Sequence, residues 1–169
     1  MAEITLRSWE NKYAERLAYL GNNINIFNNL TDSFPNPYTI EKAKIYIKST
    51  RNVRGLAQAI IWNNQIVGNI AVYQQEDIYR ANGRIAYFLG IDYWNQGIMT
   101  KAVKSMTTKC FNENPEITRI FADPFESNIG SRKALEKNGY ELEGILRKNA
   151  IKNGKYNNSY VYSKLKDTV

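Results

Sequence analysis

The feature that most constrains this chain is an apolar strand-like segment followed at once by a turn with a single glycine and by an amphipathic helix. The apolar segment covers 85–91, the turn covers 93–100 with the sequence YWNQGIMT, and a helical pattern runs from Lys101 to about Asn112. Such a turn places free backbone N–H groups at a helix N-terminus, which binds phosphate. An ordinary strand-to-helix connection explains the same segment equally well, so the rest of the chain has to decide.

Composition describes an ordinary globular chain. Its 169 residues can bury a core, so we predict one domain over 1–169. Hydrophobic residues make up 43%, and no apolar run approaches the roughly 20 residues of a membrane span, so no membrane partner is expected. The segment Met1–Thr5 is acidic where a signal peptide would be basic and then apolar, and we therefore expect a cytoplasmic protein.

Cysteine and histidine usage excludes several kinds of site. The chain has one cysteine and no histidine, which rules out an internal disulfide and a Ser-His-Asp triad. We expect no metal site, because the usual zinc ligands are missing. The one thiol, Cys110, falls in register with Ala102, Val103 and Met106 on the apolar face of the helix, so we predict a core residue rather than a nucleophile.

The chain is basic, with a formal net charge of +7 and a pI near 9.4. This suggests an anionic partner, which could be a nucleic acid, an acidic protein or a phosphorylated cofactor, and a solvated basic surface explains it as well. The lysines and arginines are scattered, without a basic stripe interleaved with aromatic residues. We therefore expect no nucleic-acid partner.

The first half of the chain predicts a helical layer and three strands. Alternation predicts a strand over 3–9, and helical spacing predicts a helix over 11–20. The segment 22–38 is rich in asparagine and should be an irregular loop with at most a short helical turn. Thr39 can cap a helix that ends near Asn52 and whose inner face holds Ile40, Ala43, Tyr46 and Ile47. Strands over 56–62 and 65–73 flank Asn63-Asn64, which suits a tight hairpin turn.

The second half predicts the centre and one edge of a mixed sheet. The segment 83–91 is apolar on both faces from Ile85 onward, which is typical of a central strand, and Gly90 inside it indicates a bulge or the close approach of another backbone. A strand over 117–122 leads to a helix over 128–138, with Ile129, Ala134 and Leu135 facing inward and an Asn138-Gly139 cap. Strands over 141–151 and 157–166, joined at Asn153-Gly154, complete a mixed sheet with helices on both faces.

Three motifs in the second half resemble one enzyme family. They are WNQGIMT at 94–100, Asn128-x-x-Ser131, and KNGYxxEG at 137–144. Together, at these spacings, they resemble the GNAT superfamily of acetyl-CoA-dependent N-acetyltransferases, and most closely its RimJ/RimL type, which acetylates protein N-termini and small amines. The resemblance implies an α/β (α+β) fold of one GNAT domain: a mixed seven-stranded sheet with helices on both faces and central strands splayed to admit CoA.

The resemblance also implies a cofactor site built largely from backbone. The family loop pattern Q/R-x-x-G-x-G/A falls on 94–99, where Trp94 replaces the first residue and Met99 the last. Its N–H groups would hold the pyrophosphate of acetyl-CoA, and the pantetheine arm would pair with the backbone of the splayed central strand. The implied cofactor contacts are Phe88, Leu89, Ile91, Gln96, Gly97, Ile98, Met99, Thr100, Asn128, Ser131 and Arg132, with Lys101 a weaker candidate.

The catalytic residue implied by the resemblance is Ser131, as general acid or thiolate stabiliser. Asn128 and Ser131 lie on one face of a helix, where simple helix capping accounts for both equally well. Many relatives place a tyrosine four residues further on, and this chain has Leu135 there. Without histidine or a reactive cysteine, we expect direct transfer in a ternary complex rather than a covalent enzyme intermediate.

The general base is harder to assign. Relatives often carry a glutamate where this chain has Arg84 and an aspartate where it has Asn158. This loss of acids disfavours a polycationic acceptor and favours a peptide N-terminus or a small neutral amine. A non-catalytic acyl-CoA-binding module is the alternative function, and a homodimer is left open. The remaining carboxylate candidates are Glu76, Asp77, Asp92, Asp123 and Glu126.

Overall fold

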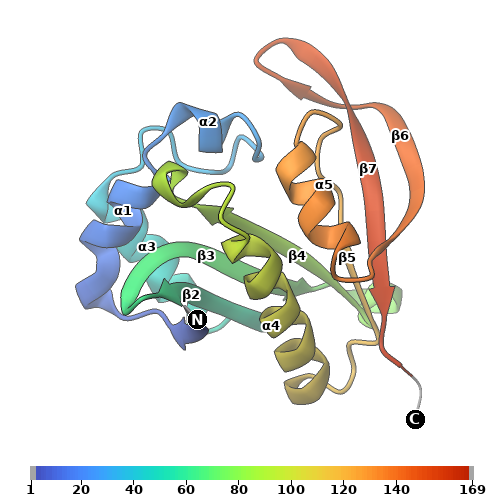
Figure 1. Cartoon of the computed structure of the whole chain (residues 1–169), viewed down its shortest axis with the longest axis horizontal. Helices are drawn as coiled ribbons and strands as arrows, with labels where there is room; N and C mark the ends of the chain where they lie inside the picture. Colours follow the sequence, from blue (N-terminus) through green and yellow to red (C-terminus); the bar gives the residue numbers. More distant parts are fainter. Residues whose placement is uncertain (1–2, 168–169) are drawn as a thin grey trace.

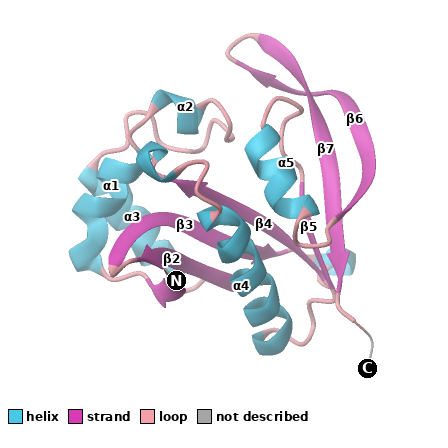
Figure 2. Ribbon diagram, in the orientation of Figure 1, coloured by secondary structure: helices cyan, strands magenta, loops and turns pink. Residues whose placement is uncertain are grey.

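The computed structural model describes residues 3–167, which form one seven-stranded sheet with helices on both faces (Figures 1 and 2). Of the domain predicted over 1–169, residues 1, 2, 168 and 169 lie outside the described part, as does the start of the acidic N-terminal segment. The strands are β1 (Ile4–Ser8), β2 (Gly55–Trp62), β3 (Gln65–Gln74), β4 (Asn82–Leu89), β5 (Arg119–Ala122), β6 (Glu141–Lys152) and β7 (Lys155–Leu165). The helices are α1 (Ala14–Gly21), α2 (Ile24–Phe27), α3 (Ile40–Thr50), α4 (Ile98–Glu113) and α5 (Ile129–Glu136), with 3-10 turns η1 (Asn11–Tyr13), η2 (Asp77–Tyr79) and η3 (Ile91–Tyr93).

The strands follow the order β1-β2-β3-β4-β5-β7-β6, and β4–β5 is the parallel pair in it. The two predicted hairpin turns are confirmed. Asn63 and Asn64 take φ of 48° and 62°, and Asn153 and Gly154 take 51° and 73°. Positive φ at both central residues matches the twist of the flanking strands, which explains the choice of asparagine and glycine.

Strands β4 and β5 separate soon after they meet. Their pairing joins Asn82 to Arg119, Gly83 to Ile120 and Arg84 to Phe121, and the later residues of β4 have no partner on that side. In Figure 1, β4 and β5 diverge toward the end where α5 lies. The splay expected for a CoA-binding fold is therefore present.

Two apolar layers enclose the sheet. Helix α4 covers one face, with Ala102, Val103, Met106 and Cys110 fully buried, which confirms Cys110 as a core residue. Helices α1 and α3 cover the other face. Figure 1 shows α4 in front of the sheet and α3 behind it. Within the described residues, no helix is both long and apolar enough to cross a membrane.

The central strand ends earlier than its sequence predicts. Strand β4 stops at Leu89, and Gly90 leads into η3, so the predicted bulge at Gly90 is wrong. A Cβ on Gly90 would lie 2.5 Å from Cδ2 of Leu20. The nearest close approach to Gly90 therefore comes from a side chain of α1, not from another backbone.

Three helix details also differ from expectation. Helix α4 begins at Ile98 rather than near Lys101. Ile40 and Ile129, both predicted to face inward, are 37% and 48% exposed. Each is the first residue of its helix, so no earlier turn packs beside it, and the buried contacts begin further on at Ala43 and Ala134.

Candidate active site

The turn before α4 presents backbone N–H groups without a side-chain cap. Gly97 is the N-cap, with φ of 73°, and no side chain closes this end of the 16-residue helix. The N–H groups of Ile98, Met99 and Thr100 consequently have no partner within the helix. An added Cβ on Gly97 would find no heavy atom within 4 Å, so the turn is open on that side. Open donors and the positive end of the helix dipole fit a diphosphate.

Side chains of this turn, including the two that depart from the family pattern, stabilise its conformation. Trp94 Nε1 donates to the carbonyl of Leu89 at 3.0 Å, which fastens the turn to the end of β4. Gln96 Nε2 donates to the carbonyl of Asp92 at 2.9 Å. Met99 packs against the core beneath α4, so its bulk is directed inward. These side chains shape the turn and leave anion binding to its backbone.

Some of the backbone groups expected to pair with the pantetheine arm already have hydrogen-bond partners within the protein. The carbonyl of Leu89 accepts the Trp94 indole, and that of Ile91 accepts the Trp94 backbone N–H at 3.2 Å. Ile91 lies in η3 and not in the strand. The edge of β4 left without a β5 partner is 85–89. There Phe88 turns its ring toward Phe34, 5.2 Å between centroids, and its backbone faces β3, so the structure does not support the expected contact of Phe88 with the arm.

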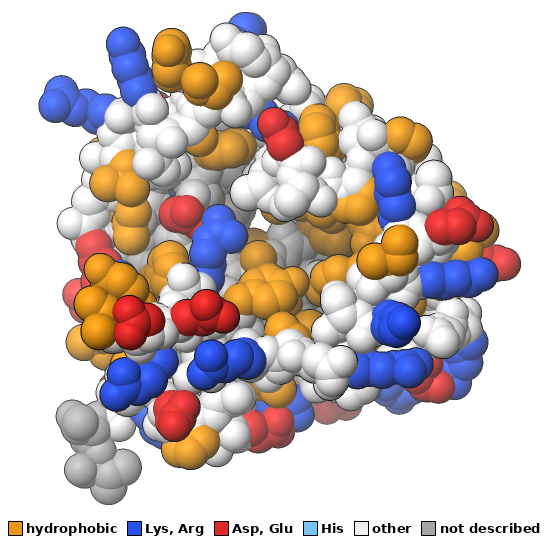
Figure 3. All heavy atoms as spheres, turned by 180° about the vertical axis from the view of Figure 1, so that it is seen from behind, with side chains coloured by type: hydrophobic (Ala, Val, Ile, Leu, Met, Phe, Trp, Pro, Cys, Tyr) orange, Lys and Arg blue, Asp and Glu red, His pale blue; other side chains and the backbone are white. Residues whose placement is uncertain are grey.

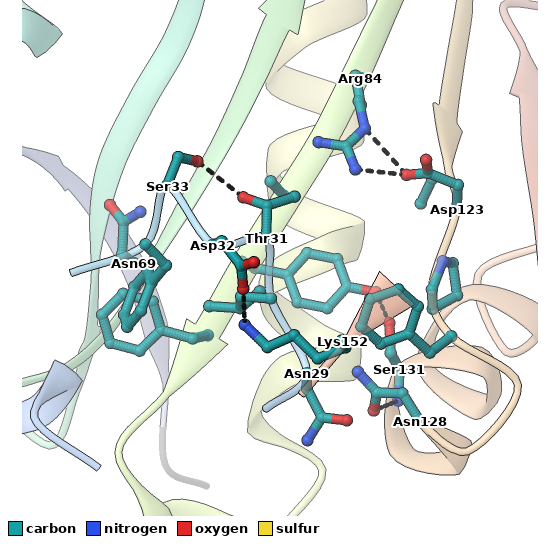
Figure 4. A pocket seen from close by; sticks show the side chains of 18 of the residues that line it. Asn29, Thr31, Asp32, Ser33, Asn69, Arg84, Asp123, Asn128, Ser131 and Lys152 are labelled. Atoms are coloured by element: carbon teal, nitrogen blue, oxygen red, sulfur yellow. Dashed lines mark hydrogen bonds and ion pairs between the residues drawn. The ribbon is translucent and has the colours of Figure 1, made fainter. Parts of the chain in front are cut away.

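Ser131 lies where α5 faces the open edge of β4. Its Oγ is 2.8 Å from the hydroxyl of Tyr87, and its N–H donates to Asn128 Oδ1 at 3.3 Å, the predicted cap (Figure 4). Burial raises the pKa of Tyr87, and the hydrogen bond to Ser131 lowers it slightly in return, so the phenol stays protonated at neutral pH. Sequence reasoning missed Tyr87. The signal available was a tyrosine in an otherwise apolar central strand.

Two further side chains fix α5 in place. Asn138 Nδ2 donates to the carbonyls of Thr100, at 2.9 Å, and of Ala134, at 2.7 Å, and so ties α5 to the first turn of α4. Arg132, an expected phosphate contact, instead donates to the Tyr162 hydroxyl and stacks 4.0 Å from the centroid of the Tyr160 ring. A phosphate would have to compete with these contacts.

A cleft of about 1110 Å³ opens on the other face of β4. Figure 3 shows this side of the molecule hollowed near its centre, with hydrophobic and charged side chains on the walls. The tip of the β6–β7 hairpin meets the loop after α2 across it. Lys152 Nζ bonds Asp32 at 2.7 Å, and Asn153 bonds Asn28 at 2.9 Å. The lining includes Asp32, Phe34, Tyr46, Asn69, Tyr73, Arg84, Ala86, Phe88, Asp123, Asn128, Ser131 and Lys152.

The structure distinguishes among the five carboxylates that the sequence left as candidates for the general base. Of the five candidates, Asp123 lines the cleft, and Arg84 holds it through Nε at 2.9 Å and Nη2 at 2.6 Å (Figure 4). Glu126 accepts hydrogen bonds from Asn158 and from the Tyr160 hydroxyl. The other three are not among the residues that line the cleft. No three His, Cys, Asp or Glu side chains between residues 3 and 167 gather as a metal site.

Comparison with known proteins decides the family. The model of the acetyltransferase (GNAT) domain matches residues 3–141. The chain belongs to the GNAT family. Among curated relatives, this GNAT chain is 35% identical to the provisionally named N-acetyltransferase YjcK of Bacillus subtilis over 92 residues, 54% of the chain and 50% of YjcK. It is 26% identical to YdaF of the same organism, provisionally named a ribosomal N-acetyltransferase, over 96% of the chain and 91% of YdaF.

Solved structures support the same assignment. The microcin C7 self-immunity acetyltransferase MccE, solved with acetyl-CoA and AMP, superposes with a TM-score of 0.82 at 27% identity, covering 96% of this chain and 92% of MccE. The ribosomal L7/L12 acetyltransferase RimL, solved with CoA, shares the fold with a TM-score of 0.83 at 19% identity, covering 96% and 93%. The GNAT chain is an acetyl-CoA-dependent N-acetyltransferase, as its sequence indicates.

Proposed function

We propose that this enzyme transfers the acetyl group of acetyl-CoA directly to a primary amine, that of a peptide or protein N-terminus or of a small molecule, within a ternary complex. Acetyl-CoA supplies the activated acetyl thioester. The turn at 94–100 would hold its diphosphate, and the open edge of β4 at 85–89 would line its pantetheine arm. The enzyme's remaining task is to bring a neutral amine to the thioester and to manage protons.

One observation carries the proposal: polar side chains leave both faces of β4 beside a single gap. Tyr87 and Arg84 leave opposite faces of β4, Tyr87 to bond Ser131 and Arg84 to bond Asp123, and the cleft reaches both sides of the gap, since Tyr87 and Ser131 line it as well. Because side chains alternate along a strand, cofactor and acceptor can approach β4 from opposite sides. They meet where β4 and β5 separate.

Ser131 and Tyr87 are suited to hold a proton beside the cofactor sulfur. A serine hydroxyl alone is a weak acid, but hydrogen bonding to a buried phenol fixes its orientation. Either hydroxyl can donate to the other, so the pair can present one O–H outward. We assign Ser131 as the residue that donates to the departing thiolate and Tyr87 as the residue that positions it.

Direct transfer is favoured because the chain offers no suitable nucleophile. It contains no histidine, and Cys110 is fully buried under α4. Burial raises the pKa of the Cys110 thiol to about 11, so it is protonated and inaccessible at neutral pH.

The test combines thiol release with CoA binding. Wild-type protein with acetyl-CoA should release CoA thiol with some members of a panel of peptides and small amines. Ser131→Ala should lower turnover on the order of 10²-fold, the low end for a lost proton donor, while calorimetry shows CoA affinity nearly unchanged. Ser127→Ala, an exposed serine just before α5, is the matched control and should change neither. Equal loss of affinity and turnover in Ser131→Ala would make Ser131 a binding residue only.

A further inference from the structure

The acceptor cleft contains a cluster of donors on one face of the sheet. Tyr73 of β3 is paired in register with Arg84 of β4, so both side chains leave the same face as neighbours. Asn69 and Phe88 are also paired in register. Each lies four residues along its strand from Tyr73 or Arg84, so both share that face. All four residues line the cleft. Arg84 thus lies next to Tyr73 on the face of the sheet that lines the cleft, at the position where relatives of the RimJ/RimL type often carry a glutamate.

Arg84 keeps one edge of its guanidinium available. Both of its bonds to Asp123 go to Oδ1, from Nε and Nη2, and within residues 3–167 no hydrogen bond engages Nη1. The side chain is 37% exposed, and in Figure 4 the unbonded nitrogen points away from Asp123 into the cavity. A guanidinium fixed on one edge and free on another is preorganised to bind a second oxyanion.

Two phenols line the same cleft as this free edge. The hydroxyls of Tyr46 and Tyr73 lie 3.4 Å apart. Asn69 Nδ2 donates to the Tyr46 hydroxyl at 2.8 Å, and this hydroxyl can donate in turn to Asn69 Oδ1 at 3.1 Å, a contact that it would exchange for one with a ligand. Burial raises the pKa of Tyr46, so it remains a neutral donor across the physiological pH range. Phenolic O–H groups in the same cleft as an arginine can supply further donors to a carboxylate without adding negative charge.

The charges of the cleft also favour a ligand with a carboxylate. Its two lining carboxylates are already matched, Asp123 by Arg84 and Asp32 by Lys152. The remaining charged residue of the lining is Lys42, a cation. A ligand with an additional positive charge has no carboxylate in the described lining that lacks an ion-pair partner. A ligand with a negative charge can interact with Nη1 of Arg84 and with the two phenols.

We infer that the acceptor carries a carboxylate in addition to its amine, and that Arg84 binds this carboxylate with help from Tyr73 and Tyr46. Acceptors of this class are amino acids, short peptides with a free C-terminus, and N-termini followed by an acidic residue. The inference rests on the proposed function, because it concerns the same cleft, but binding of the carboxylate can be measured without turnover.

The experiment uses a matched pair of product analogues. N-acetyl-alanyl-alanine and its C-terminal amide are titrated separately into the CoA-loaded protein by calorimetry. The acid should bind about tenfold more tightly than the amide, the factor expected for one charge-assisted hydrogen-bonded contact. Both ligands already carry an N-acetyl group and cannot accept another, so a failure of acetyl transfer leaves this measurement intact.

Three variants assign the preference to Arg84. Arg84→Gln should bind acid and amide equally, and Arg84→Lys should retain part of the preference because it keeps the charge. Arg84→Glu should prefer the amide. Arg80→Gln, which removes an exposed arginine outside the cleft, is the control and should keep the wild-type preference. Thermal melting of each variant establishes that it is folded.

The outcomes separate the inference from the proposed function. Equal binding of acid and amide to the wild type, no binding of either, or an unchanged preference in Arg84→Gln would each overturn the carboxylate site. Absence of thiol release with every amine, combined with an acid preference that depends on Arg84, would overturn the acetyl transfer and leave the carboxylate site standing.

Discussion

Gly97 offers a sharp test of where the CoA diphosphate binds. Its φ of 73° favours glycine, and yet an added Cβ would meet no heavy atom within 4 Å. The free protein therefore needs glycine here for its backbone conformation alone. A bound diphosphate would add a second reason, because a side chain at this position would stand beside it. Gly97→Asn and Gly97→Val separate these two reasons.

The magnitudes follow from the backbone geometry. Left-handed backbone costs a β-branched residue roughly 1–2 kcal/mol, whereas asparagine adopts it with little strain. For a domain of this size, about 1 kcal/mol corresponds to a shift in melting temperature of about 2–4 °C. Gly97→Val should therefore melt several degrees lower, and Gly97→Asn should melt close to wild type. Both should bind CoA at least about tenfold more weakly, a loss of about 1.4 kcal/mol in binding free energy.

The assay is calorimetry with CoA together with thermal denaturation. Gly154 provides a matched control, because it also has φ of 73° and open space around its Cβ position, but it lies in the β6–β7 turn. Gly154→Val should lower the melting temperature similarly without weakening CoA binding. If Gly97→Asn bound CoA as tightly as wild type, the diphosphate could not lie against this turn, and the cofactor site proposed here would be wrong.

Three further perturbations test the surroundings of the site. Tyr87→Phe removes the hydroxyl that orients Ser131 but keeps the ring, so thiol release should slow about tenfold or more while calorimetry shows unchanged CoA affinity. Asn138→Ala removes the bond to Thr100 that ties α5 to α4 and the bond to Ala134 at the end of α5, and chemical denaturation should show a loss of about 1–2 kcal/mol in unfolding free energy. Hydrogen bonds from Arg119 and then Ser163 lower the pKa of Glu143, so wild type should be more stable than Glu143→Gln at pH 7. This advantage should disappear as the pH falls through the lowered pKa of Glu143, and an advantage kept at pH 2 would contradict the assignment.

The sequence by itself determined the secondary structure and the family. Periodicity placed most strands and helices, because apolar residues repeat with the period of the element that buries them. Local turn chemistry fixed both hairpins, since Asn63-Asn64 and Asn153-Gly154 carry their conformational preference wherever they occur. The order of the motifs from 94 to 144 was enough to indicate a GNAT fold and an acetyl-CoA cofactor, which the comparisons confirm.

Only the tertiary structure decided which side chains meet. Tyr87 and Ser131 are 44 positions apart, and Arg84 and Asp123 are 39 apart. No local pattern encodes such pairs, because each arises where β4 parts from β5 and the pleat sends alternate residues to opposite faces. Sequence patterns report the face that an element buries. The distances across the gap, on which the chemistry depends, result from the packing of the whole sheet.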